Sequence, residues 1–162
     1  MVSEVEELLV GMLPRQLAAE HALCRGDAGP RSKTWSQRDP VTLFGTAVPV
    51  RSGWDEVSST FRWLTNRFTK LCDYEFELMA AGASGDLAYT VGFEHKTVSV
   101  DAEPTTYTLR VTHVYRREDG LWKTVHRHGD HATPDSGRDA GTAEHSSAPR
   151  SAASVPSRSS AT

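Results

Sequence analysis

The sequence predicts one α+β domain, in which a long N-terminal helix and a second helix pack on a curved antiparallel sheet. Within the first 70 residues, apolar residues recur at the spacing of helices, and from about residue 74 onward they alternate with polar ones, as in strands. Helices first and strands afterwards is an α+β order. A chain of 162 residues with 38% hydrophobic content can bury one core of its own.

The two helices are predicted over residues 4–25 and from Gly53 to about Lys70. Pro14 lies inside the first helix and lacks a backbone N–H donor, so we expect either a kink or two abutting helices there. A short strand is predicted between the helices at residues 41–44. The apolar stripe of the first helix consists of Val5, Leu8, Leu9, Met12, Leu13, Leu17 and Leu23, and that of the second of Val57, Phe61, Leu64 and Phe68.

The later strands are predicted to form a meander, because apolar residues alternate along residues 74–78, 87–93 and 107–115. A last strand follows them. Turn-forming residues separate the strands at 84–86, 101–104 and 118–120.

Beyond His131 the composition changes to Ser, Ala, Pro, Gly and Thr, with Val155 as the only large aliphatic residue. Such a segment cannot offset the entropy of ordering by burying apolar surface. We therefore predict a folded domain over residues 1–130 and a disordered Ser/Ala/Pro-rich tail over residues 131–162.

Charge and cysteine content argue against several classes of protein. The net charge is −3, and basic residues are interspersed with acidic ones, so we expect no nucleic-acid partner. The first seven residues are acidic and no apolar run approaches the roughly 18 residues of a membrane span, which predicts a cytoplasmic protein with no membrane partner. Cys24 and Cys72 are expected to be reduced, half-buried thiols. The sequence contains no nucleotide-binding or metal-binding motif, so we expect no cofactor and no metal.

The last hairpin holds the residues most suited to chemistry. A three-residue loop at 118–120 would place Arg117 opposite Leu121. Counting back along both strands then gives three pairs on one face, Arg116 with Trp122, Thr112 with His126, and Arg110 with His128. Glu94 joins this face if the connection at 101–105 has an odd number of residues, and an even number separates it from Arg110.

Two interpretations of this polar face remain open. In the first, Glu94, Arg110, Thr112, His126 and His128 line a pocket, where Arg110 binds an anionic or carbonyl oxygen and His126 or His128 moves protons near neutral pH. In the second, Glu94 and Arg110 form a cross-strand ion pair, and the histidines are polar members of a dimer interface.

Three further residues are candidates with simpler alternatives. His113 is a candidate for ligand contact, although its neighbours Val111 and Tyr115 favour a hydrogen-bonded histidine at the edge of the core. Glu20 and His21 on the first helix are suited either to one wall of a cavity or to a packing edge.

Segments at residues 40–45, 53–57, 84–91, 109–120 and 122–128 follow one another in an order that resembles a known family. They are similar to the SnoaL-like, ketosteroid-isomerase-related domains of the nuclear transport factor 2 (NTF2-like) superfamily, and the resemblance covers about residues 5–130. The final hairpin is also similar to the association domain of calcium/calmodulin-dependent protein kinase.

The resemblance implies a cone-shaped cavity between sheet and helices, and a homodimer formed through the sheet. Members of the family include isomerases, polyketide cyclases, dehydratases and non-catalytic binding modules, so the fold alone does not choose a reaction. The first helix has no tyrosine and no aspartate stands mid-strand, so no catalytic residue carries over from the ketosteroid isomerases. We expect a small organic ligand in the cavity, with isomerase-, cyclase- or dehydratase-type acid–base chemistry. The alternative is a non-catalytic ligand-binding or oligomerisation module.

Overall fold

The computed structural model describes residues 1–133, with residues 69–71 described by their backbone alone. The predicted tail at 131–162 lies outside the described residues except for its first three. Among the residues described, no helix has both the length and the hydropathy that a bilayer crossing requires.

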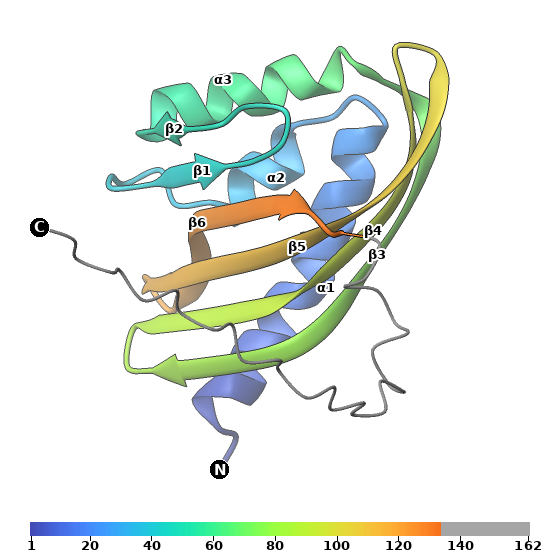
Figure 1. Ribbon diagram of the computed structural model, residues 1–162. Coiled ribbons are helices and arrows are strands. Elements are labelled where there is room, and N and C mark those ends of the chain that lie inside the picture. Colours follow the sequence, from blue (N-terminus) through green and yellow to red (C-terminus); the bar gives the residue numbers. More distant parts are fainter. Residues whose placement is uncertain (134–162) are drawn as a thin grey trace, which may run out of the picture. The chain divides into compact units, whose positions relative to one another are not determined.

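Three helices and six strands make up the domain (Figure 1). The helices are α1 (Glu4–Cys24), α2 (Gly29–Thr34) and α3 (Trp54–Thr65). The strands are β1 (Thr42–Phe44), β2 (Arg51–Ser52), β3 (Phe68–Ser84), β4 (Leu87–Val100), β5 (Glu103–Glu118) and β6 (Leu121–His131). Their order in the sheet is β2-β1-β6-β5-β4-β3, and every neighbouring pair is antiparallel except β1 and β6. The predicted α+β fold with a curved, mostly antiparallel sheet is thus confirmed.

The helix α1 begins at a capping box. The hydroxyl of Ser3 accepts a hydrogen bond from the backbone N–H of Glu6 at 3.2 Å, while the Glu6 carboxylate accepts one from the Ser3 N–H at 2.8 Å. The helix is continuous through Pro14, where either a kink or two helices were expected. The second predicted helix ends at Thr65, earlier than expected, because Phe68 already pairs with Val100 as the first residue of β3.

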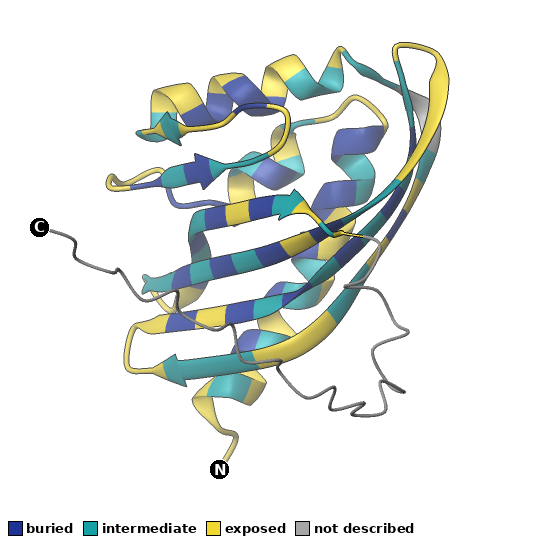
Figure 2. Ribbon diagram, in the orientation of Figure 1, coloured by how far each residue is buried: buried dark blue, intermediate teal, exposed yellow. Residues whose placement is uncertain are grey.

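The helices cover one face of the sheet, which we call the inner face, and α1 runs behind the strands in Figure 1. Figure 2 shows the alternation of buried and more exposed residues along the strands that results. Two apolar clusters fill this side. One joins α1 to the sheet through Leu8, Met12, Ala88, Tyr115 and Trp122, and the other lies under α3 and contains Leu23, Trp35, Val41, Leu43, Val48, Val57 and Phe61.

The connection between β5 and β6 is shorter than predicted. Asp119 and Gly120 alone form the loop, with φ of 52° and 78°, so Glu118 and not Arg117 lies opposite Leu121. Positive φ at both central residues is the geometry of a two-residue type I′ turn, which matches the twist of the strands. The prediction of a three-residue loop is therefore wrong.

A β-bulge then changes the register within the same hairpin. Tyr115 pairs with Thr124 and Val114 pairs with His126, so Val125 is an extra residue in β6. A bulge of this kind reverses the side to which the following side chains point, relative to unbroken alternation.

The two cysteines are joined in a disulfide, with their Cα atoms 5.6 Å apart. The expectation of two reduced thiols is wrong for this structure. The C-terminal end of α1, which carries Cys24, packs on the start of β3, which carries Cys72, and this tertiary contact brings together residues 48 apart in sequence.

Reduction of this disulfide should lower the stability of the domain by about 2–4 kcal/mol, because it removes a constraint on the unfolded chain. For a domain of this size we expect the melting temperature to fall by roughly 5–15 °C. Thermal unfolding with and without a phosphine reductant measures the effect. The control is Cys24→Ser/Cys72→Ser, whose melting temperature should not respond to reductant. Two free thiols titrated in the unreduced, denatured wild type would contradict the disulfide.

Candidate functional site

Four of the predicted site residues share one face of the sheet, the outer face, which is directed away from the helices. Thr112 lies opposite His128, Val114 lies opposite His126, and Arg110 lies opposite Asp130. The predicted partners, His126 for Thr112 and His128 for Arg110, are wrong by two residues. The residues still share a face, because the shorter turn and the bulge together shift the register by an even number.

The predicted neighbours Arg116 and Trp122 lie on opposite faces. Trp122 is buried on the inner face opposite Arg117, whose guanidinium carbon stands 4.5 Å from the centre of the indole ring. Arg116 points to the other side, where its guanidinium donates to Glu118 and to the Ser36 hydroxyl. Because the turn is one residue shorter than predicted, Arg117 takes the position beside Trp122 that was predicted for Arg116.

Glu94 is separated from Arg110. The connection between β4 and β5 consists of Asp101 and Ala102, an even number, so Glu94 points to the inner face while Arg110 points outward. Arg110 instead makes a bidentate ion pair with Asp130, with N–O distances of 3.0 and 2.7 Å. Both side chains are about half exposed to solvent. The hydrogen bond from Arg110 lowers the pKa of Asp130. A single pocket holding both Glu94 and Arg110 is therefore not formed.

The two candidate bases differ in their surroundings. His126 is part-buried beside β1, with Nδ1 2.7 Å from the hydroxyl oxygen of Thr42 and its ring 5.1 Å from that of Phe44. Burial, with the neighbouring His128, lowers the pKa of His126. The ring of His128 is exposed, also beside Phe44.

The inner side contains a cavity of about 260 Å³ between the sheet, α3 and the loop at residues 45–48. This is slightly below the about 300–1,000 Å³ typical of sites for drug-sized ligands. Its apolar lining comes from Leu23, Leu43, Val48, Leu64, Phe68, Val100 and Leu109. Five basic side chains also line it, namely Arg31, Arg67, Lys96, Arg127 and His131.

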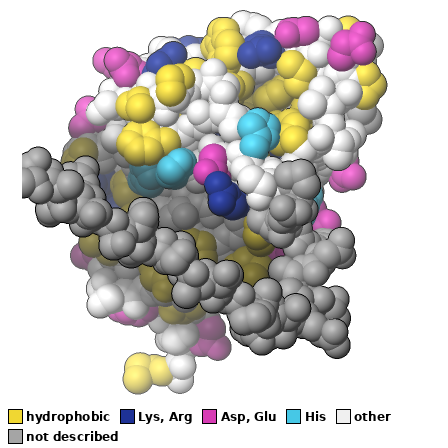
Figure 3. Space-filling view, in the orientation of Figure 1, with side chains coloured by type: hydrophobic (Ala, Val, Ile, Leu, Met, Phe, Trp, Pro, Cys, Tyr) yellow, Lys and Arg dark blue, Asp and Glu magenta, His cyan; other side chains and the backbone are white. Residues whose placement is uncertain are grey.

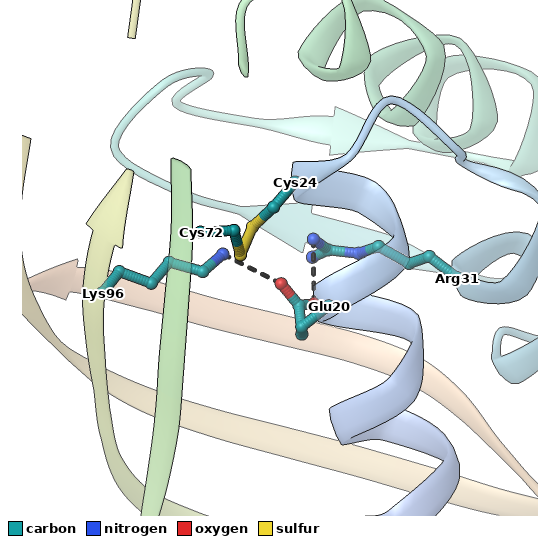
Figure 4. The surroundings of a disulfide bond; sticks show 5 residues. All are labelled: Glu20, Cys24, Arg31, Cys72 and Lys96. Carbon is teal, nitrogen blue, oxygen red and sulfur yellow. Dashed lines mark hydrogen bonds and ion pairs between the residues drawn. A yellow bond between two sulfur atoms is a disulfide. The ribbon is translucent and has the colours of Figure 1, made fainter. Parts of the chain in front are cut away.

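Behind the cavity wall, Glu20 of α1 holds two of these cations (Figure 4). Its carboxylate lies 3.0 Å from a guanidinium nitrogen of Arg31 in α2 and accepts a hydrogen bond from Lys96 Nζ of β4 at 2.9 Å. The Cys24–Cys72 disulfide lies next to this group. Burial raises the pKa of Glu20, but the charges of Arg31 and Lys96 outweigh it, so the pKa is lowered and Glu20 stays ionised.

The second buried carboxylate, Glu94, is held in the same way. Arg127 of β6 donates to it at 2.6 Å, and the hydroxyl of Tyr74 donates to its other oxygen at 3.2 Å. Burial opposes ionisation of Glu94, yet the adjacent Arg127 lowers its pKa. Burial also raises the pKa of Tyr74, so this phenol remains a donor.

His113 is buried on the inner face and does not line the cavity. Its Nδ1 has no hydrogen-bond partner among the described residues. Burial lowers the pKa of His113 to about 3, so the ring is neutral at physiological pH. Its role as a ligand contact stays a prediction.

Sequence reasoning missed all five basic residues at the cavity, among them the buried Arg31, Lys96 and Arg127. A signal for Lys96 was present, since Glu94 and Lys96 are two apart in one strand and must share a face. Glu20 was expected either in a cavity wall or at a packing edge; the structure buries it in ion pairs with Arg31 and Lys96, and it does not line the cavity.

Known proteins share this fold. The model of the SnoaL-like domain family matches residues 19–133. A search of the curated proteins finds no match.

Solved structures with the same fold are numerous, and three of them illustrate its range. An NTF2-like protein from Streptomyces avermitilis, provisionally described as a dehydratase, is 20% identical with a TM-score of 0.67, over 80% of this chain and 96% of that one. A protein from Thiobacillus denitrificans, provisionally described as a calcium/calmodulin-dependent protein kinase type II association domain, is 18% identical with a TM-score of 0.62, over 74% and 93%. A ketosteroid isomerase-like protein from Erwinia carotovora atroseptica is 20% identical with a TM-score of 0.63, over 79% and 98%.

The neutral His113 should make the domain less stable in mild acid. Its pKa in the folded state lies below the usual value of 6.5, so the unfolded chain takes up the proton first and stability is lost as pH falls from 6.5 toward 3. At pH 5 the loss from this residue should be about 2 kcal/mol. Denaturant unfolding of wild type and His113→Gln at pH 8 and pH 5 measures it.

The pH 8 comparison serves as the control, because His113 is neutral in both states there and the difference reports packing alone. The variant should lose less stability than the wild type between pH 8 and pH 5. Equal losses in the two proteins would show that His113 does not carry this dependence.

Proposed function

Since the chain belongs to the SnoaL-like domain family, we propose that it binds a small organic molecule in the cavity between its sheet and its helices. The observation that carries the proposal is the lining of the cavity. Apolar side chains from α1, α3 and several strands enclose it, and a few basic groups converge on the same space. Sites for small molecules typically combine a largely apolar wall with a small number of placed polar groups.

The proposal extends to acid–base chemistry of the isomerase, cyclase or dehydratase type. The dehydratase and ketosteroid isomerase-like descriptions of two similar structures are consistent with such an extension. His126 and His128 do not line the cavity, so they would act only on a molecule bound at the outer face. Within the cavity, His131 and Tyr107 are the lining groups placed to exchange a proton, with ring centroids 5.9 Å apart.

A cytoplasmic location is also part of the proposal. The Cys24–Cys72 disulfide argues against it, because the cytosol keeps most thiols reduced. Alkylation of free thiols during cell lysis shows whether Cys24 and Cys72 are reduced or joined in the cell.

The second candidate function is self-association through the outer face, where Arg110, Thr112, His126 and His128 would be interface residues. The face carries exposed and half-buried apolar side chains in β3, β4 and β5, and a shallow groove lies on it. Figure 3 shows hydrophobic side chains beside histidine and charged ones on the side of the molecule seen in Figure 1. The apolar set includes Met79, Tyr89, Val91, Phe93 and Val114, and Met79 and Tyr89 are 61% and 46% exposed.

Filling the cavity should abolish binding of small molecules. Thr60 of α3 lines the cavity, so the larger side chain introduced by Thr60→Phe should reduce that space. The matched control is Ser59→Phe, which places the same ring on the exposed neighbouring position. We expect Thr60→Phe to lose at least about 10-fold in affinity and Ser59→Phe to bind as the wild type does.

Two measurements check this result. Ligand-observed NMR with benzoate, phenylacetate, cinnamate and hexanoate and their amides reports binding, and mass spectrometry of extracts from the purified protein reports any retained compound. Equal binding by wild type and a folded Thr60→Phe would contradict a site in the cavity.

Self-association predicts a dimer that one charge on the outer face disrupts. Val91→Asp introduces a carboxylate in the middle of β4 on that face, and burying it unpaired in an interface is costly. Val10→Asp is the control, because Val10 is exposed on α1. Sedimentation equilibrium should give a dimer for wild type and Val10→Asp, and a monomer for Val91→Asp. A monomeric wild type would rule this candidate out.

A further inference from the structure

The charges around the cavity do not balance. The buried ionised residues of the described chain are three cations, Arg31, Lys96 and Arg127, and two carboxylates, Glu20 and Glu94. All five are between 0% and 7% exposed. His113, the remaining buried titratable base, is neutral. One positive charge is therefore left without a buried counterion.

The excess charge faces the cavity. Arg31, Lys96 and Arg127 all line it, whereas Glu20 and Glu94 stand behind them and do not. Among the described residues that line the cavity, none carries a carboxylate. An uncompensated buried charge is costly, and the cost falls when an opposite charge comes within reach.

Lys96 also has donors to spare. Its ammonium group has three donors, and among the described residues it makes one hydrogen bond, to Glu20. The Nε atoms of Arg31 and Arg127 are buried without a hydrogen-bond partner among the described residues, and because solvent does not reach them, they add to the cost of the buried charges and do not serve as donors to a ligand.

We propose that the ligand of this cavity is a small organic monoanion, a carboxylate whose oxygens face Arg31, Lys96 and Arg127. Its apolar part packs against the aliphatic and aromatic wall formed by Leu43, Leu64 and Phe68. A single negative charge is sufficient to neutralise the group, and the volume of about 260 Å³ limits the ligand to a small molecule. The inference rests on the proposed function and adds the chemical class of the ligand.

The first test compares carboxylates with neutral molecules of the same shape. Benzoate, phenylacetate, cinnamate and hexanoate are each paired with their amide, and dissociation constants are measured by calorimetry or NMR titration. We expect the best carboxylate to bind at least about 10-fold more tightly than its amide, as is typical of hydrogen bonds to charged groups.

Lys96→Met tests the charge itself. It removes one positive charge and leaves Glu20 paired with Arg31 at 3.0 Å, so no carboxylate is left buried without a partner. The preference for carboxylate over amide should fall by at least about 10-fold. The control is Arg110→Met, which removes a cation from the outer face and should leave the preference unchanged. Melting temperatures establish that both variants fold.

A second probe does not depend on the shape of the ligand. Crystals grown in sodium bromide should show an anomalous peak within hydrogen-bonding distance of Lys96, Arg31 or Arg127 in the wild type, and none there in Lys96→Met. Should no compound of the panel bind, this peak supports the inference and its absence overturns it.

The outcomes separate the two proposals. If amides and carboxylates bind equally and both are lost in Thr60→Phe, the cavity binds ligands but the anionic class is wrong. If binding persists in a folded Thr60→Phe, the site is elsewhere and the proposed function fails with it.

Discussion

Val125 is one residue more than the pairing of β5 and β6 needs, and the direction of every later side chain in β6 depends on it. With unbroken alternation after Thr124, His126 and His128 would point toward the helices and Arg127 would point to the outside. The bulge reverses all three. Arg127 consequently reaches Glu94 in the core, and the two histidines stand on the outer face. The side of the sheet on which each of these three β6 residues lies thus follows from one inserted residue.

The sequence predicts the fold class because its periodicity is clear, with helical stripes first and alternating strands afterwards. It does not predict the register of the hairpins. Asp101 and Ala102 both adopt positive φ without a glycine, and nothing in the local sequence marks the bulge at Val125. A one-residue error in a turn moves a side chain to the other face, so Glu94 and Arg110 could be assigned only conditionally. The same limit applies to Cys24 and Cys72, whose contact is made by packing and not by spacing.

The buried ionic group links parts of the fold that are far apart in the chain. Glu20 comes from α1, Arg31 from α2, Glu94 and Lys96 from β4, and Arg127 from β6. Replacing buried ion pairs with apolar side chains is often neutral or stabilising, so stability alone does not account for five buried charges. Their position around a cavity gives them a second use, since charges already desolvated and held in place need little reorganisation to meet a ligand.

The contact between Glu94 and Arg127 also constrains how this sequence can diverge. Each residue alone is a liability in the core, because loss of either leaves its partner without the opposite charge that it contacts. Substitutions at these two positions, which are 33 apart in the chain, should therefore be coupled. Among descendants of this protein they should be retained or exchanged as a couple, and covariation between them would record that history in sequence alone.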